Sequence, residues 1–133
     1  MSEKEKFSDI LNKLNFKDGE HLNEMFLNYA KGIADTFAGE KKEIKSTQFR
    51  KFYDRVLELN DKAKSLDENE FKVKILPFVK MLISKSIYAK NRGVAGEKFV
   101  KLMQISISKV NSKEELQNFK YFLEAIIGFM PKK

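Results

Sequence analysis

The chain has 133 residues with 26 basic and 19 acidic side chains, so its formal net charge is +7. Because it has no cysteine and a single histidine, disulfides, thiolate metal sites and most histidine-based metal or acid–base centres are excluded. The length predicts one domain with a sizeable core, and apolar residues are too plentiful for a disordered chain. The charged N-terminus and the lack of a long apolar run predict a soluble, cytoplasmic protein without membrane contact.

Apolar residues recur mostly at every third or fourth position, and only two prolines and six glycines interrupt them. This spacing predicts an all-α fold, a compact single-domain bundle of five to six helices spanning residues 1–133. The expected helices cover residues 2–14, 19–38, 46–64, 66–91, 97–110 and 112–130. We expect residues 1–17 to be loosely attached. Phe7, Phe16 and Met130 are candidates for an interface, with the core as the alternative, and an interface role would imply self-association.

Capping boxes, in which a serine is followed three residues later by a glutamate, mark three of these helix starts. They are Ser2 with Glu5, Ser65 with Glu68, and Ser112 with Glu115. The third helix begins at Ser46 or Thr47, either of which can cap it.

The segment 66–91 is apolar around much of its circumference, so we expect it to form the central helix of the bundle. Pro77 lies inside this segment and removes one backbone hydrogen bond, which predicts a kink there or a helix that starts near Pro77. The alternating pattern at 71–75 leaves a short strand as an alternative.

The positive charge is concentrated in residues 71–101, which contain eight basic residues and one acidic residue, Glu97. Outside this segment, the 26 basic and 19 acidic residues of the chain reduce to 18 of each. A basic segment on a neutral body is typical of a surface that binds a polyanion. The alternative is an ordinary solvated lysine-rich face.

Motifs for catalysis are missing from the sequence: it has no glycine-rich phosphate loop, no metal-ligand spacing and no plausible nucleophile–base pair. Asp54, Glu58 and Asp61 share a helix face, but Arg50 and Lys62 stand at ion-pair spacing from them, which favours a salt-paired face over a cation site. We therefore expect no enzyme activity, no cofactor and no metal.

One basic stripe is expected on the fourth helix, where cations alternate with an aromatic side chain. Its members are Lys74, Met81, Lys85, Tyr88 and Arg92. Lysine and arginine neutralise phosphates and a tyrosine can stack on a base, as in sequence-independent grooves for single strands. The alternative for Tyr88 is packing beneath the lysine stems.

A second basic patch is expected on the third helix, where Gln48, Lys51 and Arg55 share a face and Lys45 precedes the helix. The free N–H groups of the helix N-terminus would attract a phosphate at this point.

Three segments together carry a family resemblance: STQFRKF at 46–52, LP at 76–77 with IYAK at 87–90, and FKYFLEAII at 119–127. In order and spacing they resemble the small subunit of type III-A CRISPR interference complexes, the Csm complexes. The resemblance covers roughly residues 42–130. This sequence has Lys90-Asn91-Arg92 where the family commonly has an Ala-Arg pair after the tyrosine, so either Lys90 or Arg92 inherits that position.

The resemblance implies an all-helical, non-catalytic protein that repeats along a ribonucleoprotein filament. It would touch the backbone-forming subunits and neighbouring copies of itself, and would line the channel that holds the guide RNA and its paired target RNA.

Together these observations predict one basic groove that contacts RNA phosphates and riboses without reading bases. Its expected members are Lys45, Gln48, Arg50, Lys51, Arg55, Lys74, Lys85, Tyr88, Lys90 and Arg92. Two alternatives stay open: a helical regulator that binds duplex DNA, and an assembly protein that binds an acidic partner without RNA.

Overall fold

A computed structural model describes residues 3–17, 19–39 and 43–130 of the chain. The elements in chain order are α1 (Glu3–Lys13), α2 (Gly19–Glu24), the π-helix η1 (Met25–Tyr29), α3 (Ala30–Phe37), α4 (Ser46–Ala63), α5 (Glu68–Lys74), α6 (Leu76–Asn91), α7 (Glu97–Ser108) and α8 (Lys113–Phe129). Since α2, η1 and α3 are continuous and only Ile75 separates α5 from α6, the described residues form six helical rods. The predicted all-α bundle is confirmed. None of the described helices is long and apolar enough to cross a membrane.

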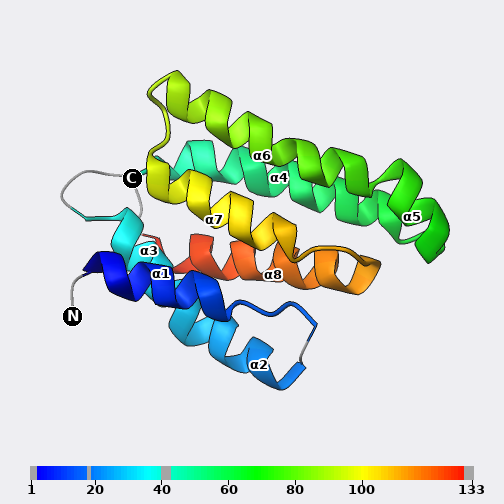
Figure 1. Ribbon diagram of the computed structural model, residues 1–133, viewed down its shortest axis with the longest axis horizontal. Coiled ribbons are helices and arrows are strands. Elements are labelled where there is room, and N and C mark those ends of the chain that lie inside the picture. Colours follow the sequence, from blue (N-terminus) through cyan, green and yellow to red (C-terminus); the bar gives the residue numbers. More distant parts are fainter. Residues whose placement is uncertain (1–2, 18, 40–42, 131–133) are drawn as a thin grey trace.

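The helices α4, α6, α7 and α8 run along the long axis of the molecule, and α1 with the α2–α3 rod covers one side (Figure 1). Helix α8 packs against α4, α3 and η1, whereas α6 packs against α7, α4 and α5. The five apolar side chains that α8 contributes to the core are fully buried: Leu116, Phe119, Phe122, Leu123 and Ile126. The central helix is therefore α8.

The prediction of a central helix over residues 66–91 was wrong. Helix α6 lies at the edge of the bundle and exposes Phe78 and Met81, which are 45% and 49% accessible. The hydrophobic content of this segment suggested burial, but no other element of the described residues covers this side of α6. The strand alternative at 71–75 was also wrong, because α5 occupies Glu68–Lys74. The expected effect of Pro77 is confirmed: it lies in the first turn of α6, where its missing N–H is tolerated.

The core is built largely from phenylalanine rings in edge-on or tilted contact. Phe99 contacts Phe37, Phe49 and Phe52 at centroid distances between 4.9 and 6.4 Å. The rings of Phe16 and Phe119 are 5.5 Å apart.

The N-terminal segment contributes to this core. Phe7 and Phe16 are only 2% and 1% exposed, so the interface alternative was wrong for both, and Met130 is partly buried against the core. The loose attachment expected for residues 1–17 stays a prediction.

Two of the three predicted capping boxes fall within described residues. Ser112 accepts a hydrogen bond from the Glu115 backbone N–H, which confirms the cap, but the Glu115 carboxylate accepts from the Asn111 N–H at 2.9 Å in place of the Ser112 N–H of a full box. The Ser65 prediction was wrong, because Asp67 caps α5 and exchanges hydrogen bonds with Glu70. The box at Ser2 and Glu5 lies outside the described side chains.

Helix α4 begins at Ser46 with Lys45 as its N-cap residue and has no side-chain cap, so the Ser46 and Thr47 capping alternative was wrong.

Three lysines bind backbone carbonyls at or just beyond helix C-termini. The ammonium of Lys80 donates to the carbonyls of Ile107 and Val110 at 2.8 and 3.0 Å, at the end of α7. Lys109 donates to the Leu14 carbonyl at 2.7 Å, just beyond α1. Burial lowers the pKa of both Lys80 and Lys109. Lys113 reaches the Leu66 carbonyl at 2.5 Å. The charges of Lys80 and Lys109 thus lie at helix C-terminal ends, where the helix dipole is negative.

The loops at one end of α4 and α6 are joined. A β-bridge pairs Ile44 with Ala95, and the Gly96 N–H donates to the Glu43 carbonyl at 2.8 Å. The Glu43 carboxylate accepts from the backbone N–H groups of Lys98 and Phe99 at 2.6 and 3.1 Å, in the first turn of α7. This junction holds the start of α4 beside the end of α6.

Candidate nucleic-acid interface

Helices α4 and α6 run antiparallel (Figure 1). Residues of both helices line an open pocket of about 410 Å³. Six of the ten predicted site residues line it: Gln48, Lys51 and Arg55 from α4, and Lys85, Tyr88 and Arg92 from α6. We call this pocket the α4–α6 groove. The two stripes, which were predicted on separate helices, thus face each other across one hollow.

The charge of the α4–α6 groove is positive throughout. Four cations line it and none of its described lining residues is acidic. Within the part of the chain that the structure describes, Lys51 and Lys85 form no ion pair. Arg55 donates to Glu58 at 2.8 Å, and this hydrogen bond is the main reason that the pKa of Glu58 is lowered. Lys51, Lys85 and Arg92 therefore present positive charge that no described carboxylate pairs with, whereas Arg55 shares its charge with Glu58.

The side chain of Tyr88 is 64% exposed, so the alternative in which it packs beneath lysine stems was wrong. The guanidinium of Arg92 lies 5.7 Å from the centre of the Tyr88 ring, a cation–π distance. The exposed ring therefore lies directly beside a cation in the groove wall.

Lys45 lies just outside the groove, in a neighbouring pocket of about 570 Å³ formed by the joined loops at 43–48 and 93–96. Gln48 lines both pockets, so they lie next to each other. Lys45 thus extends the basic surface toward the N-terminus of α4, although Glu43 also lines this second pocket.

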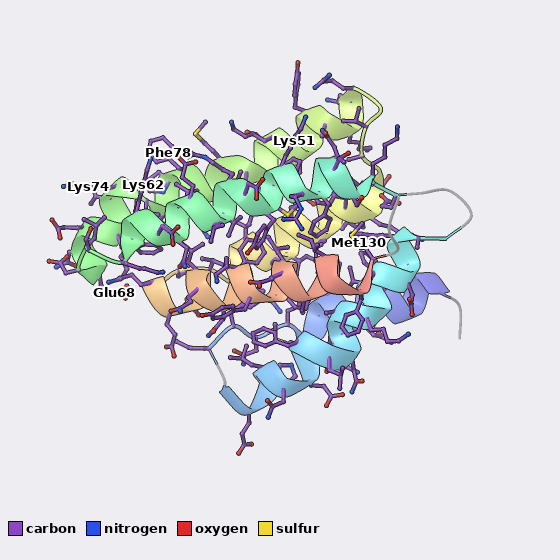
Figure 2. The ribbon with its side chains drawn as sticks, turned by 180° about the vertical axis from the view of Figure 1, so that it is seen from behind. Lys51, Lys62, Glu68, Lys74, Phe78 and Met130 are labelled. Atoms are coloured by element: carbon purple, nitrogen blue, oxygen red, sulfur yellow. The ribbon has the colours of Figure 1, made fainter. Side chains whose placement is uncertain are left out.

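The remaining three predicted residues do not line the groove. Lys74 lies on α5, 3.9 Å from Glu70, at one end of the molecule, whereas Lys51 lies nearer the middle of its length (Figure 2). The predicted stripe assumed one unbroken helix, and the break at Ile75 removes Lys74 from it. Lys90 pairs with Glu97 at 3.8 Å.

Arg50 occupies another face of α4, beside Tyr53. Burial raises the pKa of the Tyr53 phenol, which donates to Glu124 at 3.2 Å, and the nearby charge of Arg50 partly opposes this shift.

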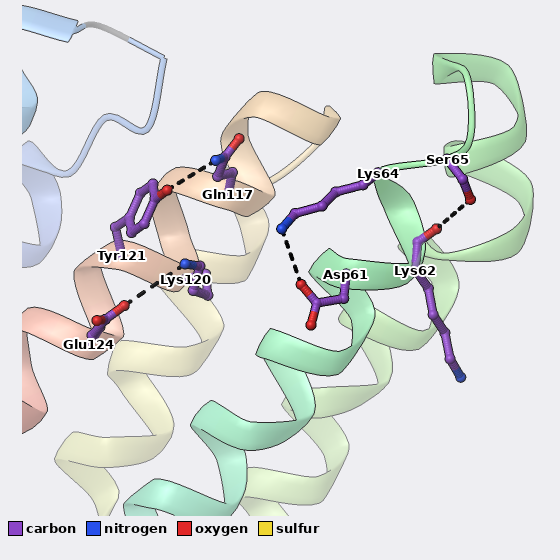
Figure 3. Close-up of polar contacts among 8 residues, drawn as sticks. All are labelled: Asp61, Lys62, Lys64, Ser65, Gln117, Lys120, Tyr121 and Glu124. Carbon is purple, nitrogen blue, oxygen red and sulfur yellow. Dashed lines mark hydrogen bonds and ion pairs between the residues drawn. The ribbon is translucent and has the colours of Figure 1, made fainter.

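The acidic face of α4 is salt-paired in part as expected: the predicted pair of Glu58 with Lys62 is present, whereas Arg50 and Asp54 form no ion pair among the described residues. Glu58 contacts Lys62 at 3.5 Å and Asp61 contacts Lys64 at 3.3 Å, the latter drawn in Figure 3. No group of three potential metal ligands occurs among the described residues.

Comparison with family models gave a match to Csm2 Type III-A over residues 20–130. Comparisons with curated proteins and with solved structures gave no match. The matched range begins well before residue 42, where the resemblance of the sequence segments began, and it includes both helices of the α4–α6 groove. The chain therefore belongs to the Csm2 family, the small subunit of type III-A CRISPR complexes.

Proposed function

We propose that this Csm2-family protein binds the backbones of the guide RNA and target RNA in the α4–α6 groove, as a non-catalytic cytoplasmic subunit. It would contact other subunits of the type III-A complex and neighbouring copies of itself. The observation that carries the proposal is the convergence of two basic stripes, from α4 and α6, on one hollow without a lining carboxylate.

The chemistry of the groove suits phosphates and riboses. Lys51, Arg55, Lys85 and Arg92 can each neutralise a phosphate, while the amide of Gln48 can hydrogen-bond a ribose hydroxyl. Of the two candidates at the family's Ala-Arg position, Arg92 lines the groove and Lys90 is paired with Glu97, so we assign the contact to Arg92.

A single copy should bind weakly. Four phosphate contacts give affinities on the order of micromolar or weaker at physiological salt. Several copies on one RNA strand would add their contacts, and the combined binding would be far tighter than that of any one copy. Sequence specificity would come from guide pairing, because backbone contacts carry no direct base information.

The test is fluorescence anisotropy with a single-stranded RNA of about 30 nucleotides, over a series of salt concentrations. If four phosphates are contacted, the logarithm of the association constant should fall against the logarithm of the salt concentration with a slope of about −3. The double variant Lys85→Glu, Arg92→Glu should weaken binding to unrelated RNA sequences by the same factor and reduce the slope by about 1.4.

The matched control is Lys17→Glu, Lys31→Glu, which changes the net charge equally at exposed positions outside the groove. It should retain most of the affinity, and circular dichroism should show unchanged helicity in both variants. Equal losses in the two variants would contradict the groove. Tighter binding to duplex DNA would favour a DNA-binding regulator. Absence of RNA binding at low salt, together with binding to an acidic subunit, would favour an assembly role.

A further inference from the structure

The α4–α6 groove has a feature that phosphate binding does not require, an apolar floor. Phe52, Leu82 and Ala89 contribute its apolar lining, and of the three Phe52, at 9%, keeps the largest accessible fraction. Contact with an apolar floor does not stabilise bound phosphates or ribose hydroxyls. It does stabilise a bound nucleobase, because the flat face of the base is removed from water there. The volume of about 410 Å³ lies within the range of pockets that hold small molecules.

The wall of the groove supplies an aromatic surface. Tyr88 is the most exposed aromatic side chain that the structure describes, at 64%. Its ring is flanked along α6 by Lys85 and Arg92, one turn before and one turn after it. An exposed aromatic ring between cations is the arrangement on which unpaired bases stack while the adjoining phosphates are neutralised.

These two surfaces meet in the same pocket, so one ligand can use both. A base inserted between Tyr88 and the apolar floor would place its own 5′ and 3′ phosphates near the cations on the rim. A base paired in a duplex is stacked on both faces and cannot enter without leaving its helix.

We infer that the α4–α6 groove accepts one unpaired nucleotide, with its base against Tyr88 and the Phe52 floor and its phosphates on Lys51, Lys85 and Arg92. This inference rests on the proposed RNA-binding function and adds a base-binding pocket to it. The pocket recognises the face of the base, so every base is accepted.

The test uses two oligonucleotides of equal length, about 12 nucleotides, within the size range of a single-strand binding site. One is an adenosine RNA, and the other is a strand of the same phosphate number in which every base is absent. Anisotropy is measured for the wild type and for Tyr88→Ala. The wild type should bind the RNA about tenfold more tightly than the base-free strand.

The variant Tyr88→Ala should lose this preference, so its two affinities become nearly equal while the salt slope stays unchanged. Tyr88→Phe should behave like the wild type because it keeps the ring. The matched control is Phe78→Ala, which removes an exposed aromatic from the same helix about 15 Å away, outside the groove. It should leave the preference intact.

The base pocket and the basic groove fail in different ways. Equal affinity of the wild type for both strands, with a steep salt dependence, would contradict the base pocket but not the basic groove. The same holds if Tyr88→Ala weakens the binding of both strands by the same factor. If neither strand binds the wild type at low salt, both proposals are wrong.

Discussion

Lys80 and Lys85 lie five residues apart on α6, and their surroundings give them different roles. The stem of Lys80 crosses the packed side of α6, and its ammonium is held by carbonyls at the end of α7. Lys85 is exposed and lines the α4–α6 groove without an ion pair in the described part of the chain. Of these two lysines, only Lys85 is free to bind a phosphate.

Ser106 on α7 is a buried polar residue whose hydroxyl has no hydrogen-bond partner among the described residues. An unsatisfied buried hydroxyl costs free energy, so Ser106→Ala should leave the free energy of unfolding unchanged or raise it by about 1 kcal/mol. Urea denaturation measures the change. Ser86→Ala is the matched control, since the buried Ser86 hydroxyl donates to the Ile83 carbonyl at 2.7 Å and its loss should not stabilise. A clear loss of stability in Ser106→Ala would contradict this account.

At the scale of elements, the start of α7 depends on a residue far away in the sequence. Gly96, its N-cap residue, has no side chain to cap the helix, and the Glu43 carboxylate accepts from the first-turn N–H groups instead. A Cβ at Gly96 would overlap that carboxylate, so a larger residue at this position would displace Glu43 from the N–H groups it caps. The same contact ties the loop before α4 to the loop after α6 and thereby sets one end of the groove.

Glu43→Ala should lower the free energy of unfolding by about 1 kcal/mol, the usual cost of losing a helix N-cap. Glu97→Ala is the control, because Glu97 lies in the first turn of α7 with an exposed side chain and one long ion pair to Lys90. Its removal should change the stability by less than about 0.5 kcal/mol. The free energy of unfolding of both variants is measured by urea denaturation. Equal losses in Glu43→Ala and Glu97→Ala would show that Glu43 contributes only its negative charge and not its hydrogen bonds to the α7 N–H groups.

At the scale of the whole molecule, α8 connects the two parts of the bundle. One side packs against α4, and another packs against α3 and η1. The ring of Phe122 is fully buried and lies 5.8 Å from that of Phe16, which precedes α2. Asn118 also donates to the Phe16 carbonyl at 2.7 Å. Helix α8 therefore anchors the N-terminal segment as well as the wall of the groove.

Phe122→Ala should lower the free energy of unfolding by about 3–5 kcal/mol, because it leaves a cavity in the centre of the bundle. Phe129→Ala, at the exposed end of the same helix with 37% of its side chain accessible, should cost far less. Thermal and urea denaturation provide the comparison. Similar losses in the two variants would be inconsistent with a core centred on α8.

The amino-acid sequence by itself predicted the all-α fold, most of the helix ranges and the family, because apolar periodicity, proline and glycine positions and short motifs are local properties. It also placed Lys51 and Arg55 on one stripe and Lys85 and Arg92 on another. Only the tertiary structure decided that these stripes face each other, that α6 lies at the edge, and that Glu43 caps a helix 55 residues later. The physical reason is that the period of a helix tells which face is apolar, whereas which neighbour covers that face depends on contacts between residues far apart in the chain.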